Sequence, residues 1–144
     1  MTRTARFTAQ QARNIGSCAV IAIAEVTGLT WEQVWEVAQY YFKRNGLNAG
    51  DKYAILKELG YKSDGFFKLM HWDRLRDPED TRCSRMTVVQ AERWMNENMP
   101  DAKLICQIDV EGSAHAIAFS NGRFHNTLGA KRARINLASI ITAA

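Results

Sequence analysis

The spacing of hydrophobic positions changes about two-thirds of the way along the chain. From Trp31 to Phe42 they recur at intervals of three and four residues, which predicts an amphipathic helix. From Ala102 onward the interval is two, because Leu104, Cys106 and Ile108 alternate with polar residues, as in a strand with one buried face. Helices followed by an antiparallel sheet predict an α+β fold.

The earliest predicted helix is short and buried. Residues 1 to 16 are polar and predict irregular structure. A nearly all-apolar run then extends from Cys18 to Val26, with Ser17 as a suitable N-cap residue before it and Gly28 as a stop after it. The β-branched residues of the run would suit a buried strand, but its alanines and its cap favour a helix.

Three further helices are predicted. The capping boxes Thr30–Gln33 and Thr87–Gln90 each open one of them, and another runs from about Asp51 to Leu59, before Gly60. The residues expected to face the core are Trp31, Trp35, Tyr41 and Phe42 in the helix after Thr30, and Val88, Ala91, Met95 and Met99 in the helix after Thr87. Residues 71 to 85 are dense in both charges and predict an exposed loop.

The sheet is predicted from strands at 104–110, 113–120, 123–128 and 133–141, with turns at Glu111-Gly112 and Asn121-Gly122. A two-residue turn at 121–122 pairs His115 with Leu128 and Ile117 with Asn126. Asn126 is then a diagonal neighbour of His115 on the same face, at roughly 7–8 Å between backbones, whereas His125 points to the other face. The register therefore selects one histidine and one amide.

Length and composition restrict the class of protein. The 144 residues suit one domain spanning 1–144, and 47% hydrophobic with 24% charged residues is ordinary for a globular protein. No apolar run is long enough to cross a membrane, and the polar start is unlike a signal peptide, so we expect cytoplasmic residence. The odd number of cysteines, three, without metal-type spacing, predicts neither a disulfide framework nor a metal site, and we expect no cofactor.

The candidate chemistry centres on Cys18. A cysteine in the first turn of a helix lies beside unpaired backbone N–H groups and the positive end of the helix dipole, both of which favour the reactive thiolate. The Cys18 backbone N–H could form half of an oxyanion hole, and Gly16 would let a substrate backbone approach closely. His115 would act as general base and Asn126 would orient its imidazole.

Two segments of the chain resemble small papain-like cysteine peptidases that are common in phages and bacteria. They are the run from Cys18 through Thr27-Gly28 to Val34, and the run from His115 through Asn121-Gly122 to Asn126-Thr127. The resemblance extends over residues 14 to 128. It implies a papain-like fold in which the nucleophile helix packs on the C-terminal sheet, with Cys18, His115 and Asn126 as catalytic residues.

The same resemblance implies an oxyanion side chain a few residues before the nucleophile, where Gln11 and Asn14 both qualify. The predicted function is therefore a cysteine hydrolase, a peptidase or isopeptidase acting on a peptide or protein substrate, in the host cytoplasm if the chain is phage-encoded.

Two other classes of protein remain as alternatives. Many members of the family have Asp directly before the cysteine, where this chain has Ser17, which motivates a catalytically inactive papain-like module that binds a host or partner protein. The net charge of +4 and the run Lys131 to Arg134 motivate a small basic nucleic-acid binder. We read that run as a solvated turn, and expect neither nucleic acid nor membrane as a partner.

Overall fold

The computed structural model describes residues 3–69 and 85–144. Its α-helices in this part of the chain are α1 (Ala9–Ile15), α2 (Cys18–Thr27), α3 (Trp31–Ala38), α4 (Ala49–Glu58) and α5 (Val88–Asn98). Its strands are β1 (Tyr61–Gly65), β2 (Leu104–Val110), β3 (Ser113–Ser120), β4 (Arg123–His125) and β5 (Ile135–Ala143), and a short 3-10 helix spans Phe67–Leu69. The α+β prediction is confirmed.

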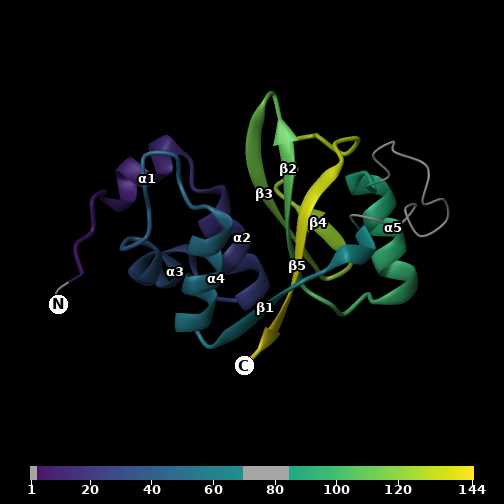
Figure 1. Cartoon of the computed structure of the whole chain (residues 1–144), viewed down its shortest axis with the longest axis horizontal. Helices are drawn as coiled ribbons and strands as arrows, with labels where there is room; N and C mark the ends of the chain where they lie inside the picture. Colours follow the sequence, from purple (N-terminus) through teal and green to yellow (C-terminus); the bar gives the residue numbers. More distant parts are fainter. Residues whose placement is uncertain (1–2, 70–84) are drawn as a thin grey trace.

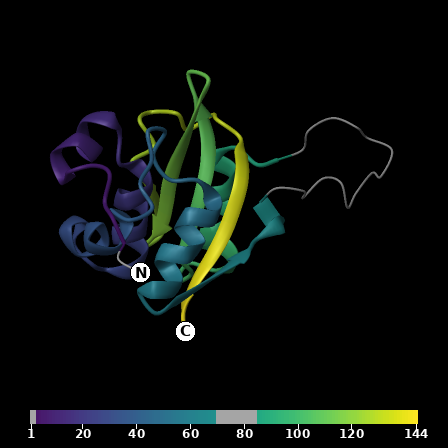
Figure 2. The ribbon, with the colours of Figure 1, turned by 60° about the vertical axis from the view of Figure 1, so that its left-hand side comes forward.

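One antiparallel sheet divides the molecule into layers (Figure 1). The strands lie in the order β1-β5-β2-β3-β4. Helices α1 to α4 lie to one side of the sheet and α5 to the other, and Figure 2 shows the same separation from a second direction. Within the described residues, no helix is long and apolar enough to cross a membrane.

Each face of the sheet has its own hydrophobic core, since successive residues of a strand point to opposite faces. On β3, Ala116 and Ala118 pack with residues of α2, α3 and α4. Ile117 and Phe119 pack on the other face, in the cluster that contains the buried residues of α5. The small side chains therefore lie on the face covered by α2, where they allow the helix to approach the strand closely.

The predicted helices are confirmed, with corrections at their ends. Helix α2 begins at Cys18, and Gly28 ends it in a left-handed conformation with φ of 74°. The capping boxes of α3 and α5 both form, at Thr30 and Thr87. Helix α3 ends at Ala38, so the helical pattern up to Phe42 extended too far.

The prediction of irregular structure over residues 1 to 16 was wrong, because α1 occupies part of it. Thr8 and Gln11 form a third capping box, in which each side chain binds the backbone N–H of the other residue. The helix buries Ala12 alone. A helix with one buried residue leaves little hydrophobic periodicity in the sequence, and the Thr-x-x-Gln spacing was the signal that could have revealed it.

The hairpin register is confirmed where β3 and β4 pair. Ala118 lies opposite His125 and Ser120 opposite Arg123, as the turn at 121–122 requires. The strand predicted to reach residue 128 ends at His125, because Asn126 and Leu128 have positive φ values of 60° and 54°, which break a ladder. Strand β1 was not predicted, because none of its residues is fully buried and the strand therefore has no buried face for a sequence pattern to show.

The loop predicted at 71 to 85 lies, apart from its last residue, outside the described residues.

Candidate functional site

Cys18 and His115 border the same cavity. The cavity lies between the start of α2, the loop that precedes α4, and the early part of β3, and its volume is about 90 Å³. Cys18 is partly buried and its thiol is free of any disulfide. Segments that are nearly one hundred residues apart in the sequence thus meet at one hollow, which the predicted Cys–His pair requires.

The first turn of α2 has no side-chain cap. Ser17 occupies the N-cap position, but its hydroxyl accepts a hydrogen bond from the Trp31 indole N–H at 3.2 Å and makes none to the helix backbone. Ser17 is thus the N-cap residue, as predicted, but its side chain makes no capping hydrogen bond. The backbone N–H groups at the start of α2 therefore lack a side-chain acceptor, and they lie next to the cavity that Cys18 borders. Such a helix start attracts negative charge.

The imidazole of His115 is held by the backbone of Asn126. His115 Nε2 lies 2.7 Å from the Asn126 carbonyl oxygen. Because a carbonyl oxygen can only accept a hydrogen bond, Nε2 donates, and in the neutral ring Nδ1 is then the free acceptor. This is the tautomer that a general base needs when its second nitrogen is anchored. The predicted neighbours do meet, but through the main chain of Asn126, whose side-chain amide binds no described residue.

The Cys18 thiol and the His115 imidazole border one cavity without a hydrogen bond between them. By the alternation along β3, the side chain of His115 leaves the strand on the face of Ile117, whereas α2 covers the opposite face. Strand β4 pairs with residues 118 to 120, so His115 lies on a stretch of β3 that β4 leaves uncovered. His115 therefore reaches the cavity from the edge of the sheet.

The two oxyanion candidates lie on α1, away from the cavity lining. The Gln11 side chain accepts the Thr8 backbone N–H as part of the helix cap, and the Asn14 side-chain oxygen Oδ1 accepts from the Gln10 side-chain amide at 3.0 Å. Both residues are exposed. Neither borders the cavity as it stands, and the oxyanion role of either residue stays a prediction.

Three polar side chains that sequence reasoning passed over do border this cavity: Asn45, Lys52 and Gln107. Gln107 lies on β2 opposite Ala116, one residue from His115. Lys52 lies early in α4, and burial lowers its pKa below the ordinary value, while attraction to the Cys18 and Cys106 sulfurs acts in the opposite direction. Lone polar residues in three separate elements carry no spacing motif, so the chain alone gave no signal for them.

Cys106 has the environment of an unreactive thiol. It is 1% exposed, and burial raises its pKa strongly, with only a smaller opposing attraction from Lys52. A buried neutral thiol is a poor nucleophile. Of the two cysteines in the described ranges, Cys18 is the one that borders the same cavity as His115.

His125 belongs to a separate polar cluster on the α2 side of the sheet. Its Nε2 lies 3.1 Å from the hydroxyl of Ser120, which donates a hydrogen bond to Glu25, and 3.3 Å from the Glu25 carboxylate. Ser120 is 1% exposed, so this cluster fastens the end of α2 to the hairpin. His71 lies outside the described residues. Within residues 3–69 and 85–144, no three His, Cys, Asp or Glu side chains lie together as metal ligands.

No protein-family model matches the chain, and neither a curated protein nor a solved structure resembles it at a significant level.

Proposed function

We propose that the chain is a papain-like cysteine hydrolase that cleaves a peptide or isopeptide bond in a protein or peptide substrate. The observation that carries the proposal is the cavity bordered by both Cys18, at the uncapped start of α2, and His115, whose Nε2 is anchored on Asn126. The likeness to papain-like peptidases rests on the sequence, and cytoplasmic residence, in the host cytoplasm if the chain is phage-encoded, is part of the same proposal.

The reaction would proceed by acyl transfer. His115 Nδ1 takes the proton of the Cys18 thiol, and the thiolate attacks the carbonyl carbon of the scissile bond. The C–N bond breaks, the amine leaves with the proton from the imidazolium, and a thioester remains on Cys18. A water molecule, deprotonated by the imidazole, then attacks the thioester and releases a carboxylic acid and the free thiol.

The start of α2 suits the charge that develops on the carbonyl oxygen. Backbone N–H groups without a side-chain acceptor can donate to an oxyanion there, with the Cys18 N–H as the nearest candidate. Among side chains, Gln107 supplies an amide donor from the β2 side of the cavity. It offers an alternative to Gln11 and Asn14 for the second donor.

The distance between thiol and imidazole has to shorten during the reaction. Catalytic hydrogen bonds are often long or absent before substrate binds, and tighten in the complex. Because β4 does not pair with β3 at His115, turning the imidazole toward Cys18 would displace no strand but would break its hydrogen bond to Asn126, so movement of the α2 start toward His115 is the alternative that keeps the anchor.

The experiment measures alkylation by iodoacetamide from pH 5 to 9, with peptide mapping that separates Cys18, Cys83 and Cys106. We expect Cys18 to react at least tenfold faster than a free thiol near neutral pH. His115→Gln should remove this advantage, whereas His125→Gln, the matched control on the next strand, should keep it. Cleavage of a fluorogenic peptide library should disappear in Cys18→Ala. Alkylation of Cys18 no faster than a free thiol refutes the activated nucleophile.

A catalytically inactive binding module is the second candidate. The missing hydrogen bond between Cys18 and His115 favours it, as does the engagement of Ser17 with Trp31. This candidate predicts that Cys18→Ala leaves the biological effect of the protein unchanged, and loss of the effect argues for the enzyme.

A further inference from the structure

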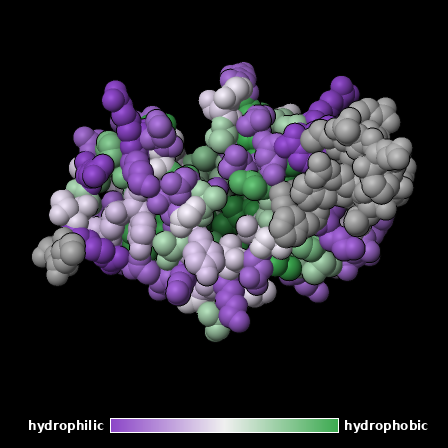
Figure 3. All heavy atoms as spheres, viewed as in Figure 1, coloured by the Kyte–Doolittle hydropathy of each residue, from purple (hydrophilic) through white to green (hydrophobic). Residues whose placement is uncertain are grey.

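A second cavity adjoins the one at Cys18. It lies between α4 and strands β1, β2 and β5, and with about 200 Å³ it is the larger of the two. Its hydrophobic lining includes Leu56, Ile105 and Leu137. In Figure 3, hydrophobic surface gathers in a hollow in the middle of the molecule, between the helices and the sheet. Lys52 and Gln107 border both cavities, so the two hollows adjoin each other.

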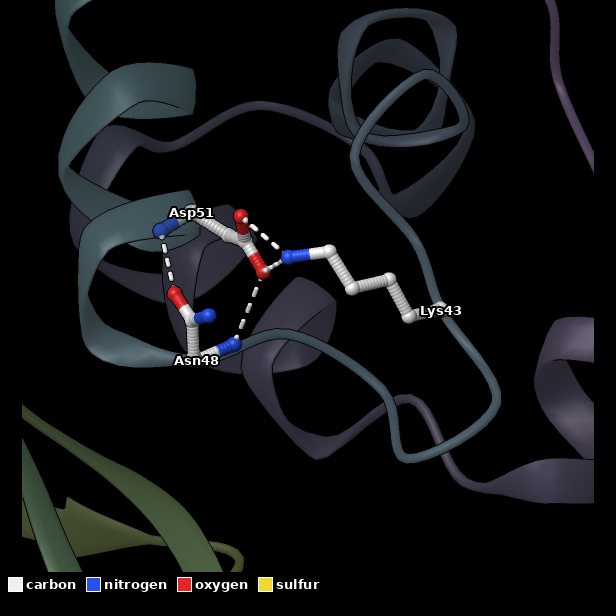
Figure 4. Close-up of polar contacts among 3 residues, drawn as sticks. All are labelled: Lys43, Asn48 and Asp51. Atoms are coloured by element: carbon white, nitrogen blue, oxygen red, sulfur yellow. Dashed lines mark hydrogen bonds and ion pairs between the residues drawn. The ribbon is translucent and has the colours of Figure 1, made fainter.

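Lys52 is a cation without a counterion at the junction of these cavities. In the part of the chain that the structure describes, no carboxylate or other acceptor binds its ammonium group. The adjacent acid is already engaged: Asp51 accepts the Lys43 ammonium at 3.0 and 3.1 Å and the Asn48 backbone N–H at 3.0 Å (Figure 4). Asp51 therefore caps α4 and neutralises Lys43, and leaves the charge of Lys52 unbalanced.

A partly buried cation without a partner is costly, because the charged form loses hydration and gains no ion pair. The lowered pKa of Lys52 is the expression of that cost. A carboxylate placed beside the ammonium would restore the charged form and gain from the low local dielectric. Lys52 borders the cavity of Cys18 and also the apolar cavity that adjoins it.

We propose that Lys52 and the adjoining apolar cavity form a binding subsite for a substrate peptide in which a carboxylate lies next to a large apolar side chain. The apolar side chain fills the hollow lined by Leu56, Ile105 and Leu137, and the carboxylate pairs with the Lys52 ammonium. The carboxylate is that of an acidic residue or of the peptide C-terminus. This proposal rests on the hydrolase function proposed for Cys18, because the subsite adjoins the cavity that the nucleophile borders.

Binding to the full chain carrying Cys18→Ala measures the subsite without turnover. The probes are fluorescein-labelled random octapeptides with a fixed central Leu-Glu or Leu-Gln pair, and octapeptides ending in Leu as the free acid or the amide. In one of the two pairs, Leu-Glu against Leu-Gln or free acid against amide, we expect the peptide with the carboxylate to bind about tenfold more tightly than its neutral counterpart, as a charge-assisted contact does. The pair that shows this preference identifies the source of the carboxylate.

Variants of Lys52 assign this preference. In Lys52→Met the preference should fall to about onefold, Lys52→Arg should retain most of it, and Lys57→Met, an exposed lysine on the same helix, should leave it unchanged. Replacing Leu by Ser in the peptides should weaken binding in every Lys52 background. Equal binding of the charged and neutral peptides, or a preference that survives in Lys52→Met, overturns the subsite.

The subsite and the hydrolase can fail separately. Cleavage by the unaltered protein without any carboxylate preference refutes the subsite and leaves the hydrolase standing. A Lys52-dependent preference in binding, without cleavage or fast alkylation of Cys18, refutes the hydrolase and retains the subsite as a peptide-binding site.

Discussion

The contact between His115 and Asn126 allows the backbone and the side chain of Asn126 to be separated experimentally. The anchor of Nε2 is the Asn126 carbonyl oxygen at 2.7 Å, and Asn126 has φ of 60°. Asn126→Gly removes the amide and keeps both the carbonyl and a backbone for which this φ is favourable. We therefore expect the Asn126→Gly imidazole to keep the proton on Nε2.

The expected magnitudes follow from the same geometry. A hydrogen bond of this kind contributes about 1 kcal/mol, a factor of about five in the ratio of the two imidazole tautomers. Asn126→Ala also keeps the carbonyl, but a left-handed alanine costs about 1 kcal/mol. Asn126→Ala should thus lower the melting temperature by about 3 °C relative to Asn126→Gly, with the same tautomer.

The assay is the ¹⁵N chemical shifts of the two His115 ring nitrogens above pH 8, which report which nitrogen carries the proton. The pH profile of Cys18 alkylation is recorded in the same variants. Transfer of the proton to Nδ1 in Asn126→Gly, or loss of fast alkylation there, shows that the side-chain amide orients the ring. That result refutes the role assigned to the carbonyl and restores the one that the papain-like resemblance implies.

Other predictions concern the surroundings of the site. Burial raises the Cys106 pKa above the ordinary 9.0, so above about pH 9 the unfolded chain loses this proton while the folded chain keeps it. Stability should therefore fall with rising pH by up to about 1.4 kcal/mol per pH unit, and urea unfolding of Cys106→Ala should lack this component. Burial lowers the Lys52 pKa, so at pH values below that pKa the charged ammonium destabilises the folded state, and this destabilisation disappears as the pH rises and the group loses its proton. Lys52→Met should therefore match or exceed the native melting temperature at pH 7. Ser120→Ala leaves Glu25 and His125 without the buried hydroxyl and should cost about 1–3 kcal/mol in urea unfolding, with exposed Ser113→Ala as the neutral comparison. Ala116→Leu should separate α2 from β3, lower stability by about 1–3 kcal/mol and slow Cys18 alkylation.

Local signals were sufficient for most of the secondary structure. The capping boxes at Thr30 and Thr87 fixed two helix starts, and Asn121-Gly122 fixed the hairpin register, because each of these signals acts within a few residues. Helix α1 and strand β1 lack a clear buried periodicity. The Thr8–Gln11 capping box is a local signal for α1, whereas β1 depends on its pairing with β5, which no short window records.

The candidate site divides in the same way between local and tertiary information. The position of Cys18 at a helix start and the proximity of His115 to Asn126 follow from local patterns and register. The hydrogen bond from Trp31 to Ser17 depends on how α2 and α3 pack, and the position of Lys52 at the cavity depends on how α4 packs against the sheet. Neither is encoded in a spacing.

The alternation of β3 explains why Cys18 and His115 can border one cavity from opposite faces of the sheet. Ala116 and Ala118 keep the strand surface flat beneath α2, so the helix start lies close to the strand that carries His115. Strand β4 pairs with residues 118 to 120 of β3 and not with the stretch that carries His115, whose imidazole binds the Asn126 carbonyl beside that edge. The small side chains of Ala116 and Ala118 are thus part of what brings the start of α2, and Cys18 with it, to the strand that carries His115.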